Sequence, residues 1–167
     1  MYAYGRTPPR PKGAPNSMPA PVLIFTWGNP SRGDDALGPA LFDMLEAHKR
    51  ETGELPEVEV LTDFQLQIEH AVDLEERECI IFVDASITCA EPFELEQLAG
   101  ERDDTFTTHA MSPSSLLSVY EQVNGCEPPP SWLLTIRAYE FGLGKEMTAQ
   151  ARENLQEAFE HILTKPW

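Results

Sequence analysis

The chain has 167 residues and a mass of 18.7 kDa, with 41% apolar and 24% charged residues. This is the size of a single domain that buries about 70% of its unfolded surface, and no apolar run approaches the roughly 18 residues of a membrane span. With 28 acidic and 12 basic residues the formal net charge is −16, which argues against nucleic acid or an anionic membrane as partner. The three cysteines form no C-x-x-C pair, so we expect no disulfide framework and a cytoplasmic location.

The first 20 residues differ in composition from the rest. They contain five prolines, three basic residues and no acidic residue. Because proline holds the backbone extended and removes hydrogen-bond donors, residues 1–20 are predicted to form a mobile Pro-rich tail, and the simplest interpretation is an extension without its own function. No apolar segment follows the basic residues, so the tail does not resemble a secretory signal. Residues 21–167 are predicted to form a single α/β domain.

From residue 21 the sequence alternates between strand-like and helix-like patterns. Residues 22–27 (VLIFTW) form an apolar run that ends at a glycine, which is typical of a strand buried on both faces. Apolar residues at helical spacing predict a helix at about 35–50, and an alternating segment predicts a second strand at 57–61. A helix at 65–74 and a third apolar run at 79–84 complete the order βαβαβ, which is typical of a parallel sheet with helices on both faces.

The remaining segments carry weaker patterns. Residues 92–98 alternate and are expected to form an edge strand, with an antiparallel orientation as one option. A helix is predicted at 112–123, with Ser112 as its N-cap. Another strand at 132–138 and a final helix at 148–163 follow. The predicted fold is therefore a three-layer α/β/α domain with a mostly parallel twisted sheet of about five strands.

The loop after the first strand, residues 28–35 (GNPSRGDD), lies where open α/β sheets bind their ligands. Its G-x-x-x-x-G spacing resembles a phosphate-binding loop, but Asp34 and Asp35 stand where that motif has Lys and Ser or Thr. Two carboxylates at a helix N-terminus repel a polyphosphate and instead complement the helix dipole or gather a cation. The glycines of this region are five residues apart, so the loop is not a dinucleotide fingerprint either.

Aspartates at two strand ends are candidate site residues. Asp34 and Asp35, taken singly, are expected to cap the helix that follows them, although one can cap while the other points into the cleft. Asp84 ends the third strand, where a single aspartate most often marks a turn. Because the ends of parallel strands lie side by side, Asp35 and Asp84 can converge on one pocket.

His109 is the candidate third ligand. It lies in a polar loop (TTH) ahead of a predicted helix, whereas His48, His70 and His161 lie on predicted helices and are expected to be surface or packed residues. An imidazole beside two carboxylates suits a borderline divalent metal. A loop histidine is more often a simple surface residue, so the spacing leaves both interpretations open.

Three motifs, taken in this order, resemble those of the [NiFe] hydrogenase maturation endopeptidases. They are residues 28–38 (GNPSRGDDALG) after an apolar strand, residues 82–85 (FVDA), and residues 108–109 (TH) ahead of a helix. The resemblance extends over about residues 21–163, and the glycine and acidic loop is its most specific part. It implies an α/β fold with a central sheet and a metal-sensing cleft.

The resemblance also implies a function. Members of this family remove a short C-terminal extension from the large-subunit precursor of a [NiFe] hydrogenase once nickel is installed. Carried over by motif, the catalytic and nickel-contacting residues would be Asp35, Asp84 and His109, and the family has Glu or Asp at the first of these positions. The nickel would arrive with the precursor, so we expect no tightly held resident metal, although Zn²⁺ or Cd²⁺ would be accepted by the same ligands. The protein is expected to act as a monomer.

Two segments distinguish this chain from many family members. After the second strand, where many have D-G-G-T, it has TDFQLQIE at 62–69, and together with residues 138–144 (AYEFGLG) this segment is similar to the branch serving bidirectional NAD(P)-linked hydrogenases. The sequence has no G-x-S-x-G elbow, no H-E-x-x-H motif and no cysteine-protease signature. We therefore hypothesise attack by water on a peptide bond positioned at the metal, which would polarise the carbonyl, lower the pKa of its water or act only as a template.

Two other functions are compatible with the sequence. A non-catalytic nickel-binding chaperone for hydrogenase assembly would use the same ligands without cutting the precursor. A nucleotide-binding α/β module fits the architecture by analogy alone, and the Asp34–Asp35 pair argues against it.

Overall fold

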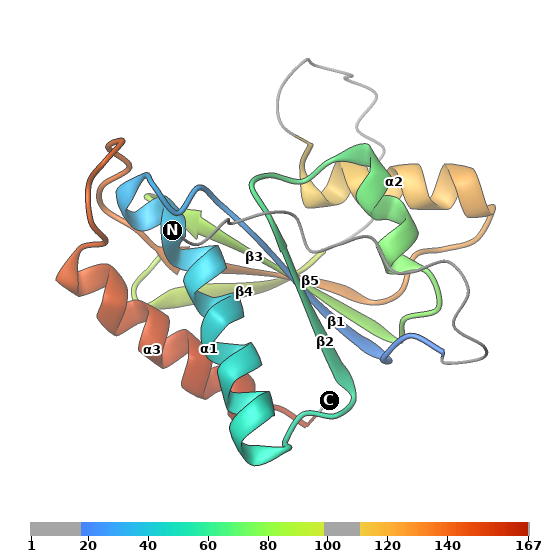
Figure 1. Cartoon of the computed structure of the whole chain (residues 1–167). Helices are drawn as coiled ribbons and strands as arrows, with labels where there is room; N and C mark the ends of the chain where they lie inside the picture. The colour runs from blue at the N-terminus through green and yellow to red at the C-terminus, as the bar shows by residue number, and fades with distance from the viewer. Residues whose placement is uncertain (1–17, 99–110, 167) are drawn as a thin grey trace.

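A computed structural model of the chain describes residues 18–98 and 111–166 and has a five-stranded sheet at its centre (Figure 1). The strands are β1 (Val22–Trp27), β2 (Val58–Asp63), β3 (Cys79–Ser86), β4 (Phe93–Leu98) and β5 (Ser131–Arg137). Their order is β2-β1-β3-β5-β4; the first four of these run parallel, and β4 pairs antiparallel with β5 at the edge. The predicted fold class is confirmed, while residues 1–17 of the predicted tail lie outside the described residues.

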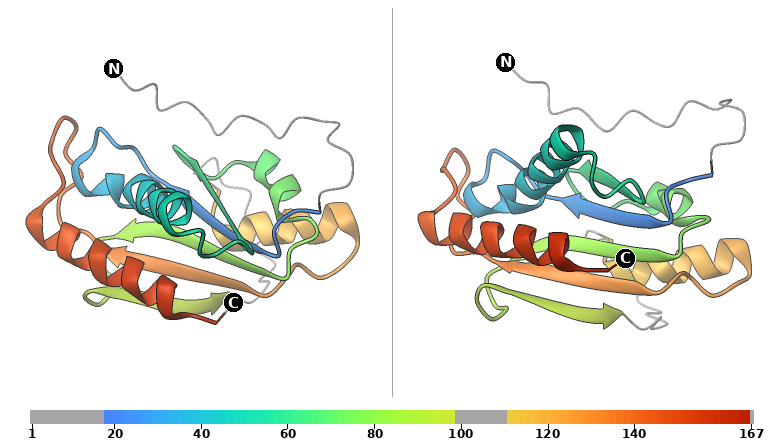
Figure 2. Two further views of the ribbon diagram at one scale, coloured as in Figure 1. Left: turned by 60° about the horizontal axis from the view of Figure 1, so that its bottom comes forward. Right: turned by 90° about the horizontal axis from the view of Figure 1, so that it is seen from below.

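Helices cover both faces of the sheet, so the molecule has three layers (Figures 1 and 2). On one face lie α1 (Leu37–Thr52) and α3 (Ala149–Thr164), and on the other lie the short 3-10 helix η2 (Ile68–Leu74) and α2 (Pro113–Asn124). Alternate residues of β1 point to the two faces: Ile24 belongs to the core under α1 and α3, and Phe25 to the core under η2 and α2. Burial on both faces explains why β1 and β3 are continuous apolar runs.

The crossover from β2 to β3 differs from its prediction. The predicted helix over 65–74 is wrong: the chain bends at residues 64–65, Gln67 has an extended backbone, and only the 3-10 helix η2 follows. Leu66 is buried, which holds this part of the chain against the sheet. Gln67 and His70 form a capping box at the start of η2, so the turn begins three residues later than the apolar spacing indicates.

The other predicted elements are present within a few residues of their expected bounds. The Ser112 side chain accepts a hydrogen bond from the Ser115 N–H, which confirms it as the N-cap of α2. Thr148 caps α3 in the same way through the Ala151 N–H. Over residues 18–98 and 111–166, no helix combines the length and apolar character that crossing a membrane requires.

Gly38, in the first turn of α1, allows the helix to pass close to β1. A Cβ at this position would lie 2.2 Å from the Trp27 carbonyl oxygen. We expect Gly38→Ala to lower the free energy of unfolding by more than about 2 kcal/mol, because backbone must move to relieve the clash. The control is Gly53→Ala, at the C-cap of α1, where φ is 72° and nothing lies within 4 Å; it should cost about 1 kcal/mol. Urea denaturation of both variants measures the difference, and equal losses would contradict the close approach.

Candidate functional site

The candidate site lies at the carboxyl edge of the parallel strands. Trp27 at the end of β1 is the register partner of Asp63 at the end of β2, and Asp84 in β3 is the register partner of Thr135 in β5. The 3-10 helix η1 (Gly33–Ala36) follows β1 and carries both aspartates of the first loop. The topology therefore brings the segments around the first loop and the end of β3 to one edge of the sheet.

Asp34 is buried and ties two loops together. Its carboxylate accepts hydrogen bonds from the Tyr139 N–H at 2.8 Å and the Glu140 N–H at 3.1 Å. It also accepts the Thr148 N–H at 2.7 Å and the Thr148 hydroxyl at 3.0 Å. No side chain caps η1 or the helix α1 that follows it, so the expectation that Asp34 caps the following helix is wrong. The donors to Asp34 come from the loop between β5 and α3, so the sequence of the first loop alone does not indicate these contacts.

The Asp34 bonds also set the start of α3. The Thr148 hydroxyl donates to Asp34 while its oxygen accepts the Ala151 N–H, so one side chain links the buried carboxylate to the helix cap. Backbone bonds reinforce the contact, because the Asp34 N–H donates to the Glu140 carbonyl at 2.7 Å and the Gly33 N–H to the Lys145 carbonyl at 3.0 Å. The two loops lie side by side in Figures 1 and 2. Asp34 is therefore an anchor for the site and not a ligand in it.

Asp35 is held by a tight turn of the first loop. Its Oδ2 accepts a hydrogen bond from the Asn29 N–H at 2.9 Å. Gly28 makes the turn possible, because it has φ 149° and a Cβ there would lie 2.0 Å from the Asp35 carbonyl oxygen. Asp35 caps neither η1 nor α1, so helix capping is the wrong interpretation for both aspartates.

Asp84 is a partly buried carboxyl with a perturbed pKa. Burial, with a smaller contribution from the negative charge of Asp35, raises the pKa of Asp84 from 3.8 to about 6. Hydrogen bonds from the Ala85 N–H and the Trp27 side chain oppose this rise. The strand continues to Ser86, so Asp84 lies within the strand and does not terminate it. The Asp35 effect places the two carboxylates within electrostatic reach of each other.

Two partly dehydrated carboxylates that repel each other form an arrangement suited to a divalent cation, which neutralises both. His109, the predicted third ligand, lies outside the described residues. Among the described ranges 18–98 and 111–166, no group of three His, Cys, Asp or Glu side chains is placed to hold a metal ion. The described part of the site therefore consists of the Asp35 and Asp84 pair.

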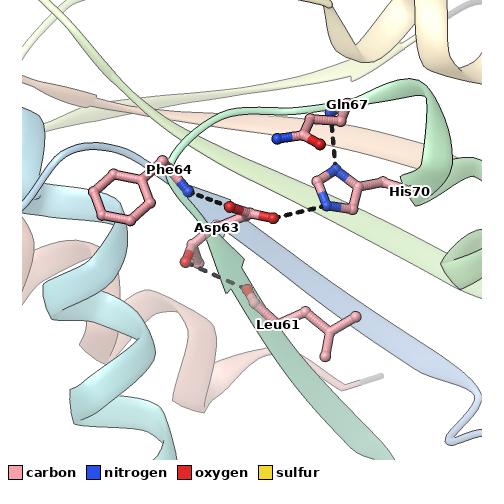
Figure 3. Close-up of polar contacts among 6 residues, drawn as sticks. Leu61, Asp63, Phe64, Gln67 and His70 are labelled. Atoms are coloured by element: carbon pink, nitrogen blue, oxygen red, sulfur yellow. Dashed lines mark hydrogen bonds and ion pairs between the residues drawn. The ribbon is translucent and has the colours of Figure 1, made fainter. Parts of the chain in front are cut away.

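A further polar pair, which sequence reasoning missed, lies beside this site at the end of β2. His70 Nε2 is 3.1 Å from Asp63 Oδ2, and His70 Nδ1 accepts the Gln67 N–H at 2.9 Å (Figure 3). Because a backbone N–H can only donate, Nδ1 carries the lone pair and Nε2 carries the proton that Asp63 accepts. Asp63 also accepts the Phe64 N–H through Oδ1 at 2.7 Å, and its carbonyl accepts the Gly28 N–H at 3.2 Å. The sequence feature that could have revealed this pair is an aspartate at the end of a strand followed by a histidine seven residues later. It was overlooked because the histidine lies in a segment predicted to be a helix.

Comparison with known proteins shows which class shares this fold. No family model matches the sequence, and no curated protein matches it. Solved structures of [NiFe] hydrogenase maturation proteases match most of the chain.

Three such structures illustrate the likeness. The protease HycI from Thermococcus kodakarensis has a TM-score of 0.64 and 20% identity, covering 86% of this chain and 90% of its own. The endopeptidase HybD from E. coli has a TM-score of 0.64 and 19% identity, covering 85% and 89%. HybD from Thermococcus kodakarensis has a TM-score of 0.61 and 21% identity, covering 86% and 99%. The chain therefore has the fold of the hydrogenase maturation proteases, as the sequence motifs predicted, while the branch serving bidirectional hydrogenases stays a prediction.

The contrast between the neighbouring aspartates leads to a stability prediction. Asp34→Asn replaces an acceptor surrounded by donors with a group that itself donates, so we expect a loss of at least about 3 kcal/mol. Asp35→Asn keeps an oxygen for the Asn29 N–H and removes a repulsive charge, so the change should stay within about 1 kcal/mol. Chemical denaturation of the two variants tests this, and a similar loss in both would contradict the assignment of Asp34 as the anchor.

The raised pKa of Asp84 predicts a stabilising variant. Between about pH 4 and 6 the native state keeps a proton on Asp84 that the unfolded chain releases, so this group stabilises the fold at low pH and the contribution is lost as the pH rises through about 6. Asp84→Asn cannot ionise, so it should be more stable than the parent by about 1–2 kcal/mol above pH 7, and the gain should shrink below pH 5. Denaturation midpoints across this range measure the effect. A stability difference between variant and parent that stays constant from pH 4 to above pH 7 would exclude a raised pKa.

Proposed function

We propose that this protein is an endopeptidase that removes the C-terminal extension of a [NiFe] hydrogenase large-subunit precursor after nickel has been inserted. The fold shared with hydrogenase maturation proteases over most of the chain supports the general activity. The observation that carries the proposal is the pair of carboxylates, Asp35 and Asp84, whose mutual repulsion helps to raise the pKa of Asp84. Such a pair gains most from a divalent cation brought to it.

In this proposal the nickel belongs to the substrate. Asp35 and Asp84 would contact it from the protein side, and His109 would complete the contact set as a neutral imidazole. The nickel would serve as a Lewis acid or as a template that places the scissile peptide for attack by water, and Zn²⁺ or Cd²⁺ would occupy the same ligands. Asp34 and Thr148 would take no part in the reaction, because their polar atoms are engaged with each other and with the backbone.

The setting follows from the same proposal. The precursor is the partner, and we propose that the protein meets it as a monomer in the cytoplasm. The three cysteines are free thiols, which suits a reducing compartment. The strongly acidic composition favours neither nucleic acid nor a membrane surface as partner.

The proposed function predicts a nickel-dependent cut. The purified protein is incubated with the large-subunit precursor, with and without nickel loaded, and intact mass is recorded. We expect loss of a C-terminal peptide only from the nickel-loaded precursor. Asp35→Asn, Asp84→Asn and His109→Gln should each reduce the cleavage rate by about a hundredfold or more, because each would remove a metal contact.

Matched controls separate these effects from general damage. Asp43→Asn, an exposed carboxyl on α1, and His48→Gln, which pairs with Glu54 at the far end of α1, should cleave at the parent rate. Association with the precursor without any cut would support the nickel-binding chaperone in place of the protease. Normal cleavage by all three site variants would contradict the assigned residues.

A further inference from the structure

Exposed apolar side chains lie at the carboxyl edge of the sheet. Within the described ranges, seven large hydrophobic residues are exposed, and five of them, including Val72 on η2, lie in the segments that follow parallel strands. Phe64 (49% exposed) and Ile68 (53%) follow β2, Ile87 (54%) follows β3, and Leu143 (76%) follows β5. We call these four side chains the apolar rim. The rim flanks the ends of β1 and β3, which carry the candidate site, because the strand order is β2-β1-β3-β5.

The β2 side of the rim is rigidly presented. The Phe64 N–H donates to the Asp63 carboxylate at the start of this segment. Near its end, the His70 ring accepts the Gln67 N–H and also bonds to Asp63. Hydrogen bonds therefore hold the segment from Phe64 to Ile68 near both of its ends. Figure 3 shows the Phe64 ring on the opposite side of the Asp63 carboxylate from His70. Leu66 takes the buried position of this segment, which leaves Phe64 and Ile68 facing outward.

The other members of the rim are also held on hydrogen-bonded turns. Ile87 lies in a turn where Ser86 Oγ accepts the N–H groups of Thr88 at 3.2 Å and Cys89 at 3.1 Å. Leu143 is followed by Gly144, whose N–H donates at 2.7 Å to the Ser31 carbonyl in the first loop. These turns keep the apolar side chains in water, and a bound partner would remove that apolar surface from water.

The charge around the rim selects the occupant. The segments that follow the four parallel strands, residues 28–36, 63–74, 84–92 and 138–148, contain nine acidic residues and only two basic ones, Arg32 and Lys145. A second copy of this chain would present the same acidic segments and carries the same formal net charge of −16, so self-association is disfavoured. A polypeptide with basic and apolar side chains matches both the charge and the exposed rim.

We propose that the apolar rim binds an extended segment of the substrate protein that alternates apolar and basic side chains, and so leads the polypeptide past Asp35 and Asp84. The outer strands that the rim residues follow, β2 and β5, lie three strand spacings apart, about 14 Å, which is the length of about four extended residues. This inference deepens the proposed function, because it gives the class of polypeptide that the same site accepts.

A synthetic probe tests the rim independently of the hydrogenase. Fluorescence anisotropy is used to follow binding of a labelled peptide of alternating Leu and Lys, and of its counterpart with Glu in place of Lys. The parent should bind the Lys peptide and not the Glu peptide, and Ile68→Ser/Leu143→Ser should weaken Lys-peptide binding at least about tenfold. Val123→Ser is the matched control, because Val123 is 72% exposed at the end of α2, away from the carboxyl edge, and it should bind as the parent does.

The same variants tested on the precursor separate the two proposals. If the parent cuts the nickel-loaded precursor, the double variant should raise KM about tenfold and leave kcat within about twofold, because the rim binds substrate and does not touch the reacting bond. If the parent does not cut the nickel-loaded precursor, the proposed function fails. The peptide measurement then still tests whether the apolar rim binds an apolar and basic polypeptide. Equal peptide affinity in the parent, the double variant and Val123→Ser would overturn the inference. Equal binding of the Glu peptide, or a dimer that the double variant dissociates, would also overturn it.

Discussion

The buried carboxylate of Asp34 is the interaction on which the geometry of the candidate site depends. It accepts four hydrogen bonds from the loop between β5 and α3, including the Thr148 hydroxyl that caps α3. This contact fixes the first loop from one side, and the bond from Gly28 to the Asp63 carbonyl fixes it from the other. Asp35, the next residue, is then left at the carboxyl edge of the sheet with its Oδ2 bound to the Asn29 N–H. The anchor Asp34 and the candidate ligand Asp35 are therefore adjacent in the sequence, but Asp34 is buried among donors whereas Asp35 lies at the carboxyl edge of the sheet.

The ionised form of Asp84 is costly to the fold. Burial and the charge of Asp35 raise the pKa of Asp84 to about 6, so at neutral pH the fold carries an ionised carboxyl that would be more stable protonated. The polar groups beside the site are paired: both ring nitrogens of His70 and both carboxylate oxygens of Asp63 have a hydrogen-bond partner. Stored repulsion of this kind is typical of a site that gains stability when a cation or a charged substrate arrives.

Much of the fold follows from local sequence patterns, whereas the site follows from contacts that are distant in the chain. β1 and β3 are apolar runs because they are buried on both faces, so both strands can be predicted from the sequence. Ser112 can likewise be predicted as an N-cap, because serine is a preferred residue at that position. The strand order also brings Asp35 and Asp84 to one edge. The role of Asp34 was predicted wrongly because its donors lie more than a hundred residues away. The Asp63–His70 pair was missed because Leu66 and His70 are spaced as in a helix, whereas the burial of Leu66 and the capping box delay the start of η2 to Ile68.

The central claim is that Asp35 and Asp84 accept one metal ion together. The most direct test is an NMR titration of the protein with Ni²⁺ at a pH well above 6, where Asp84 is ionised. Paramagnetic nickel should broaden the amide signals of Asn29, Asp35 and Ala85 over the same concentration range, and Asp84→Asn should abolish the broadening in both segments. Broadening confined to one segment, or unchanged in the variant, would contradict the claim.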